Sequence, residues 1–200
     1  MATSAQGGRV AVSVVLGVAL AAVTAAQSPD AAEGFARKLE LLQGNSLSAS
    51  PAAQRIVVTE AELNSYLRYA LVNDLPAGVT EPSVVMEGAG RLSARAVVDL
   101  DQVTAERRSG SRLDPLALIG GKVPVTLAGV VRARNGVARL TLESTTISGI
   151  EVPPFLVQQL FAHYSRSAEH PDGIGLDEPF PLPAAIREIQ LGKGRAVVIQ

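Results

Sequence analysis

Residues Lys122–Thr146, KVPVTLAGVVRARNGVARLTLESTT, alternate between apolar and polar side chains on both sides of a central Asn-Gly pair. Asn135-Gly136 is the preferred dipeptide for a two-residue type I′ turn, which places Arg134 opposite Val137. Counting outward from this turn predicts a nearly apolar face with the pairs Ala133/Ala138, Val131/Leu140, Gly129/Leu142 and Leu127/Ser144. The opposite face is predicted to carry Arg132/Arg139, Val130/Thr141 and Ala128/Glu143. Turn and alternation agree, so the segment is predicted to be an antiparallel hairpin.

The sequence around this hairpin predicts more antiparallel strands. Side chains in Arg91–Asp101 alternate with period two, which is typical of a half-buried strand. A shorter strand is expected at Ser83–Glu87, before the turn Gly88-Ala89-Gly90. Near the carboxyl end, 189–191 and 196–199 flank Gly192-Lys193-Gly194 and predict a second hairpin.

Three helices are expected from their start signals. One follows Ser28-Pro29-Asp30, and another follows Thr59, which forms a capping box with Glu62 three residues later. A third begins at Pro153-Pro154, because proline is tolerated in the first helical turn. The sequence therefore predicts a single α+β domain over residues 27–200. Its expected form is a strongly curved antiparallel sheet, or half-barrel, with two or three helices on the concave side.

Residues 1–26 have the pattern of a signal peptide. Arg9 is the only charge before Asp30, an apolar run covers Val10–Val23, and small residues follow it. The run is shorter than the roughly 20 residues that span a bilayer, so cleavage is predicted. The mature protein is expected to be periplasmic or secreted. An uncleaved leader that tethers it to the membrane is the alternative.

Composition excludes several classes of function. Without the leader, 17 basic and 19 acidic residues remain, and this balance argues against a nucleic-acid-binding protein. The chain has no cysteine, which excludes disulfides, thiol catalysis and cysteine metal sites. Aromatic residues make up 4% of the chain, so the interior is expected to be aliphatic.

No catalytic or metal-binding pattern stands out, and we expect no enzyme activity, metal or cofactor. His163 and His170 are expected at a helix end and in a loop, where structural roles are commoner. Asp99 and Asp101 are expected on one strand face as solvated edge charges. An enzyme that uses Ser, Asp or Glu is a third hypothesis. Three loop carboxylates lack the spacing of an EF-hand and are expected to be ordinary loop residues: Asp172, Asp177 and Glu178.

The apolar face of the sheet is the predicted ligand site. Its side chains are small or slender, and ligand pockets are mostly apolar with few polar anchors. A filled core is the alternative, and the apolar turn Leu113–Ile119 is a candidate lid. The predicted lining consists of Leu67, Leu71, Leu92, Ala94, Val98, Leu127, Val131, Leu140, Leu142, Leu160 and Phe161.

Three arginines of the hairpin are candidate contacts for anionic headgroups at a membrane surface: Arg132, Arg134 and Arg139. The alternative is a solvated sheet face, with Glu143 or Asp99 as partners.

Three segments carry a resemblance to a known family: VVTEAELNSYL (57–67), NGVARLTLESTTISGIEVPPFLVQQL (135–160) and PLPAAIREIQLGKGRAVV (181–198). The chain resembles small bacterial envelope proteins of the YpmS-like and LmeA-like groups over Ile56–Ile199. In these groups a T-x-x-E/D-L-N helix start precedes a sheet, and a G-x-x-x-P segment introduces a second helix. The Ser165–Pro181 loop and the Arg107-Arg108 loop match nothing in this pattern.

The resemblance implies a half-barrel wrapped on a helix, like a tubular lipid-binding (TULIP) module, with a lipid-related envelope role and no catalytic residues. The leading expectation is a non-catalytic exported protein that binds a lipid or another apolar ligand between sheet and helices. The alternative is a structural or scaffolding envelope protein with a filled core and a protein partner.

Overall fold

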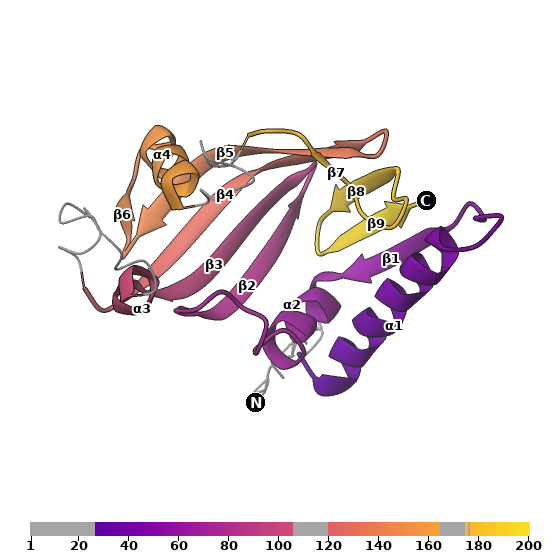
Figure 1. Cartoon of the computed structure of the whole chain (residues 1–200), viewed down its shortest axis with the longest axis horizontal. Helices are drawn as coiled ribbons and strands as arrows, with labels where there is room; N and C mark the ends of the chain where they lie inside the picture. Colours follow the sequence, from indigo (N-terminus) through magenta and orange to yellow (C-terminus); the bar gives the residue numbers. More distant parts are fainter. Residues whose placement is uncertain (1–26, 106–119, 165–174, 176) are drawn as a thin grey trace, which may run out of the picture.

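The computed structural model describes residues 27–105, 120–164, 175 and 177–200. Within these ranges the chain has an α+β fold of four helices and one antiparallel sheet of nine strands, so the predicted α+β class with an antiparallel sheet is confirmed (Figure 1). The expected leader (1–26) and the candidate lid (113–119) lie outside the described residues.

Helices and strands are interspersed along the chain. The helices are α1 (Pro29–Ser46), α2 (Glu60–Tyr69), α3 (Leu100–Ala105) and α4 (Pro154–Tyr164). The strands are β1 (Arg55–Thr59), β2 (Val79–Gly88), β3 (Arg91–Asp99), β4 (Lys122–Arg134), β5 (Val137–Ile147), β6 (Ile150–Glu151), β7 (Phe180–Pro181), β8 (Glu188–Gly192) and β9 (Arg195–Ile199).

Strand β4 joins the two parts of the sheet. Along one edge it pairs with β5. Along the other edge it pairs with β3 from Lys122 to Val130, and then with β8 at Ala133. The order β1-β9-β8-β4-β3-β2 therefore places β2 and β3 on one part, and β1, β8 and β9 on the other (Figure 1).

The β4–β5 hairpin has the predicted turn. Asn135 and Gly136 both have positive φ, at 54° and 77°, as a type I′ turn requires. The predicted pairs from Arg134/Val137 to Gly129/Leu142 are confirmed. The pairs predicted beyond them are wrong, because a bulge lies next to Gly129 and leaves Glu143 without a cross-strand partner. Leu127 is consequently opposite Thr145, and Ala128 is opposite Ser144.

The main hydrophobic core lies where α1 and α2 pack against β1 and β9. Leu42, Val58, Ile186 and Val198 are buried there, and Phe35 and other apolar side chains pack around them. β1 pairs with β9 along its whole length, although about 140 residues separate them in the chain. The predicted closing hairpin is confirmed, and this long-range pairing completes its side of the sheet.

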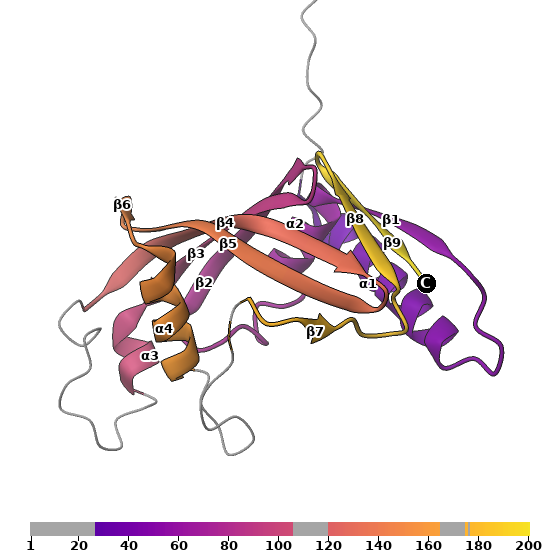
Figure 2. The ribbon, with the colours of Figure 1, turned by 90° about the horizontal axis from the view of Figure 1, so that it is seen from above.

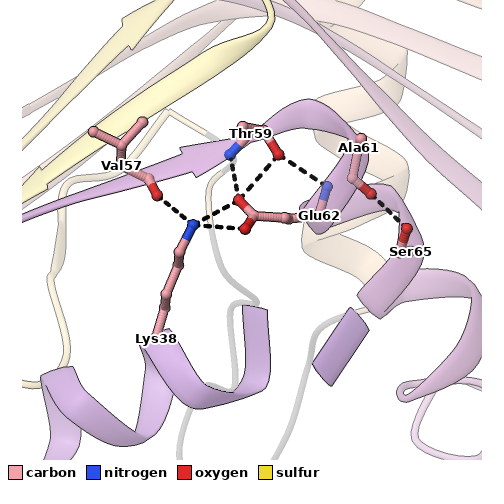
Figure 3. Close-up of polar contacts among 6 residues, drawn as sticks. All are labelled: Lys38, Val57, Thr59, Ala61, Glu62 and Ser65. Carbon is pink, nitrogen blue, oxygen red and sulfur yellow. Dashed lines mark hydrogen bonds and ion pairs between the residues drawn. The ribbon is translucent and has the colours of Figure 1, made fainter. Parts of the chain in front are cut away.

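Both amino-terminal helices have the predicted caps. The Ser28 hydroxyl accepts a hydrogen bond from the Ala31 amide at 3.2 Å. Thr59 and Glu62 form the complete capping box of α2. Ser65, fully buried in α2, donates to the Ala61 carbonyl (Figure 3) and accepts from the Ser28 amide. The start of α1 is thereby attached to α2.

Helix α2 lies along the edge strand β2 and hydrogen-bonds to its backbone. The buried Asn64 side chain donates to the Val84 carbonyl and accepts from the Val84 amide, each at 2.7 Å. The Glu60 carboxylate accepts from the Met86 amide at 2.7 Å. These side chains hydrogen-bond to backbone amide and carbonyl groups at the edge of the sheet that could otherwise pair with another strand.

The helices α3 and α4 lie at the far end of the sheet from α1 and α2 (Figures 1 and 2). The strand predicted over Arg91–Asp101 ends two residues early. Asp99 accepts from the amides of Asp101 and Gln102 at 3.1 and 3.2 Å, so its carboxylate is used at the start of α3. α4 begins at Pro154, within the predicted Pro-Pro start. Among the described helices, none combines the length and apolar character needed to cross a bilayer.

Candidate functional site

The predicted apolar face forms in the sheet as rows of paired residues. Met86, Leu92, Gly129 and Leu142 make one row across β2, β3, β4 and β5. The next row consists of Val84, Ala94, Leu127 and Thr145. Because directly opposite residues share a face, these side chains all lie on the same side of the sheet.

This face is covered unevenly between the two groups of helices: Met86 and Thr145 are buried, at 4% and 1% exposed, while other residues of the two rows stay partly exposed. Every predicted lining residue whose side chain is described is half-buried, and none reaches the burial of the core around Leu42. This set comprises Leu67, Leu71, Leu92, Ala94, Val98, Leu127, Val131, Leu140 and Leu142. The side chains of Leu160 and Phe161 lie outside the described part of the structure.

A hollow of about 640 Å³ lies between the carboxyl end of α2 and the start of β2. Leu67 lines it, together with Val72, Leu75, Val79 and Pro82. Val79 pairs with Val98, so the hollow adjoins the apolar face. Only Leu67 belonged to the predicted lining. Several of the other residues lie at a bulge in β2, where Glu81 has a φ of 52°. Pro82, directly before the predicted strand Ser83–Glu87, was the available signal of that irregularity.

Thr145 places a hydroxyl on this apolar face. Its side chain is 1% exposed, and Oγ1 has no hydrogen-bond partner in the described structure. In a regular ladder Ser144 would lie opposite Leu127, and Thr145 would face the other side of the sheet. The extra residue Glu143 shifts the register by one, so Thr145 lies opposite Leu127 and faces the apolar side.

The three predicted arginines lie on the opposite face. Arg132 is directly opposite Arg139, and this pair alternates along the ladder with Val131/Leu140 and Ala133/Ala138. All three arginines are exposed. Glu143, considered as a partner for them, pairs instead with Arg91 of β3. Arg134 lies 3.8 Å from Glu188 of β8. The arginines thus do not share a surface with the apolar lining.

The most developed polar cluster joins α1, β1 and α2. Lys38 Nζ donates to both carboxylate oxygens of Glu62, at 2.6 and 2.7 Å, and to the Val57 carbonyl at 2.7 Å (Figure 3). Burial alone would raise the pKa of Glu62, but the hydrogen bonds from Lys38 and Thr59 outweigh burial and hold that pKa below its ordinary value. Each group already has its partners, so the cluster serves to attach elements to one another.

The catalytic and metal candidates gain no further support from geometry. Asp101 lies in α3, where Oδ2 accepts from the Gly121 amide at 3.0 Å, and Asp99 caps that helix, so the expectation that both lie on one strand face is wrong, although Asp101 is exposed as expected. Asp177 and Glu178 are exposed, whereas Asp172, His170 and the side chain of His163 are not described. Across the described ranges, no cluster of His, Asp or Glu has the arrangement of a metal site.

Comparisons with known proteins identify no relative. No protein-family model matches the chain, and neither a curated protein nor a solved structure is significantly similar to it. The resemblance to YpmS-like and LmeA-like envelope proteins therefore stays a prediction from short motifs. Any functional conclusion must come from the molecule's own surfaces.

Proposed function

We propose that this protein binds a lipid or another apolar ligand without catalysing its conversion. The observation that carries the proposal is the unevenly covered apolar face of β2 to β5, between α1 and α2 at one end and α3 and α4 at the other. Large exposed apolar surfaces on soluble domains mark binding sites more often than ordinary surface. The adjoining hollow at Val79 supports the same function.

The slender lining is suited to an extended aliphatic chain. Ala94, a small residue, lies directly opposite Leu127 of β4. Each methylene that leaves water contributes about 0.8 kcal/mol, so about ten carbons contribute roughly 8 kcal/mol. Association costs roughly 4–15 kcal/mol in lost translational and rotational freedom, so this burial is of the size needed to offset that cost. An acyl chain is therefore the simplest ligand for this surface.

We also propose that the sheet is a half-barrel with its helices on the concave side. The row Ala133, Ile189, Val198 and Ile56 connects the apolar hairpin face to the core against which α1 packs. The apolar residues and α1 are therefore on the same side of the sheet. The arched course of β4 and β5 in Figure 2 supports the same arrangement.

The proposed place of action is outside the cytoplasm, in the periplasm or beyond it. Its support is the leader pattern of residues 1–26, in which a short apolar run follows Arg9. A retained leader would hold the binding face near a membrane, where apolar ligands are found.

A structural protein that binds a partner is the second candidate. One observation favours it: large apolar side chains are exposed on β6 and α4. Ile150 is 72% exposed and Phe155 57%. A surface of this kind suits a protein partner at the far end of the sheet.

A titration with a neutral apolar dye, Nile red, distinguishes the two functions. Ala94→Phe places a ring on the apolar face, and Ser93→Phe places the same ring on the opposite face of the same strand. We expect native protein to bind the dye, Ala94→Phe to bind it at least fivefold more weakly, and Ser93→Phe to bind it normally. Thermal unfolding checks that both variants are folded. Equal dye binding by all three proteins, or none by the native protein, would contradict the proposal.

A further inference from the structure

A second hollow, of about 750 Å³, lies where β3 begins and where β8 runs alongside β4. Its lining comes from the turn before β3, from both strands of the β4–β5 hairpin and from β8. Four of the lining residues are arginines, Arg91, Arg132, Arg134 and Arg139, and Glu188 is the only carboxylate among them. The chain as a whole is slightly acidic, so this concentration of positive charge is local.

Two of the four arginines have carboxylate partners and two do not. Arg91 pairs with Glu143 and lies 4.0 Å from Glu87, while Arg134 pairs with Glu188. The side chains of Arg132 and Arg139 make no ion pair or hydrogen bond within the described part of the chain. They are direct cross-strand neighbours, and like charges in this arrangement destabilise a sheet, so an anion bound between them would relieve the repulsion.

The backbone around this arginine pair is firmly held. At the tip of the hairpin, the Gly136 amide donates to the Arg187 carbonyl at 2.9 Å and the Leu182 amide donates to the Gly136 carbonyl at 2.8 Å. On the other side, the Gly90 amide donates to the Leu191 carbonyl of β8, and the Gly90 carbonyl accepts from the Val131 amide of β4. The strands that carry the two guanidinium groups are thus fixed relative to β8 before any ligand arrives, which lowers the ordering cost of binding.

We propose that this hollow binds a phosphate-type oxyanion between Arg132 and Arg139. A guanidinium group presents a planar fork of donors that matches phosphate oxygens. A phosphomonoester carries a charge of about −1.5 to −2 near neutral pH, which matches two uncompensated arginines better than a single carboxylate does. The volume leaves room for the group that carries the phosphate. Val131 of the apolar lining also borders the hollow, but Arg132 and Arg139 are directed to the opposite face, so the proposal does not depend on the function proposed above.

Calorimetric titration of the full chain at low ionic strength tests the site with two ligands. One is glycerol phosphate in solution, and the other is vesicles of phosphatidylcholine with phosphatidic acid, a lipid phosphomonoester, compared with phosphatidylcholine alone. The test variant is Arg132→Gln/Arg139→Gln. The control, Arg95→Gln/Arg195→Gln, removes the same charge from exposed arginines outside the hollow. We expect at least a tenfold loss of affinity in the test variant and less than a twofold change in the control.

The two ligands separate the sources of the oxyanion. If the test variant loses affinity for glycerol phosphate, the site takes a soluble ligand. If it loses affinity only for the anionic vesicles, the site takes a lipid headgroup. Equal losses in test and control variants would show general charge attraction and overturn the proposal, as would no binding of either ligand. Arg132→Lys/Arg139→Lys, which keeps charge but loses the fork, should bind more weakly than native protein. Unchanged Nile red binding by the test variant separates this result from the apolar site.

Discussion

Glu62 connects three elements through one carboxylate. It accepts hydrogen bonds from Lys38 of α1 and from the amide and hydroxyl of Thr59 at the end of β1, while its own helix begins there (Figure 3). The capping box was predictable from the spacing of Thr59 and Glu62, because it is a local pattern. The bond from Lys38 was not, since it depends on how α1 packs.

Replacing Glu62 by glutamine should make stability less dependent on pH. The folded state lowers the pKa of this carboxyl from 4.5, so its contribution is complete above about pH 4.5 and is lost as the pH falls through the folded-state value. At pH 7 we expect Glu62→Gln to lower the free energy of unfolding by about 1–2 kcal/mol. The difference between native and variant protein should shrink below pH 4.5.

Urea denaturation at several pH values measures this difference. Glu40→Gln is the matched control, because Glu40 is an exposed acid on α1. It should change stability by less than about 0.5 kcal/mol at every pH. A Glu62→Gln effect that stays constant from pH 7 to pH 3 would mean that the carboxylate charge is not what stabilises the cluster.

Among the elements, the β4–β5 hairpin was predicted correctly in one part and wrongly in another. Turn residues and alternation determined the register near Asn135, and that part was correct. The bulge next to Gly129 has no recognisable local pattern, because Glu143 would fit a regular strand equally well. Glycine at 129 is explained only by the folded hairpin, where a Cβ atom would lie 2.5 Å from the Thr141 carbonyl oxygen.

Gly129→Ala should destabilise the protein by about 2 kcal/mol or more, because the methyl group overlaps the backbone of β5. Gly44→Ala in α1 is the control. Nothing lies within 4 Å of a Cβ atom there, and alanine is the better helix former by about 1 kcal/mol. Chemical denaturation should therefore show opposite signs for the two variants. Similar small effects at both positions would mean that the bulge does not bring the strands this close.

At the scale of the whole molecule, the sequence indicated the apolar face but not its surroundings. The alternation of apolar and polar residues predicts which side chains share a face of the sheet. How far that face is covered depends on where α1, α2 and α4 pack. The pairing of β1 with β9 and the approach of β8 to β4 bring together distant segments, and no local pattern encodes them. The hollow beside β8 was missed for this reason, although Arg132, Arg134 and Arg139 had been predicted as contacts for anionic headgroups.

Native mass spectrometry of the full chain, purified from the envelope of the cells that produce it, tests the central claim most directly. The account predicts that part of the protein carries an added mass that fits a lipid, and that Ala94→Phe reduces this fraction while Ser93→Phe does not. The same spectra report whether residues 1–26 have been removed. Protein that is ligand-free in all preparations, with an interior that takes up no added fatty acid, would contradict the account.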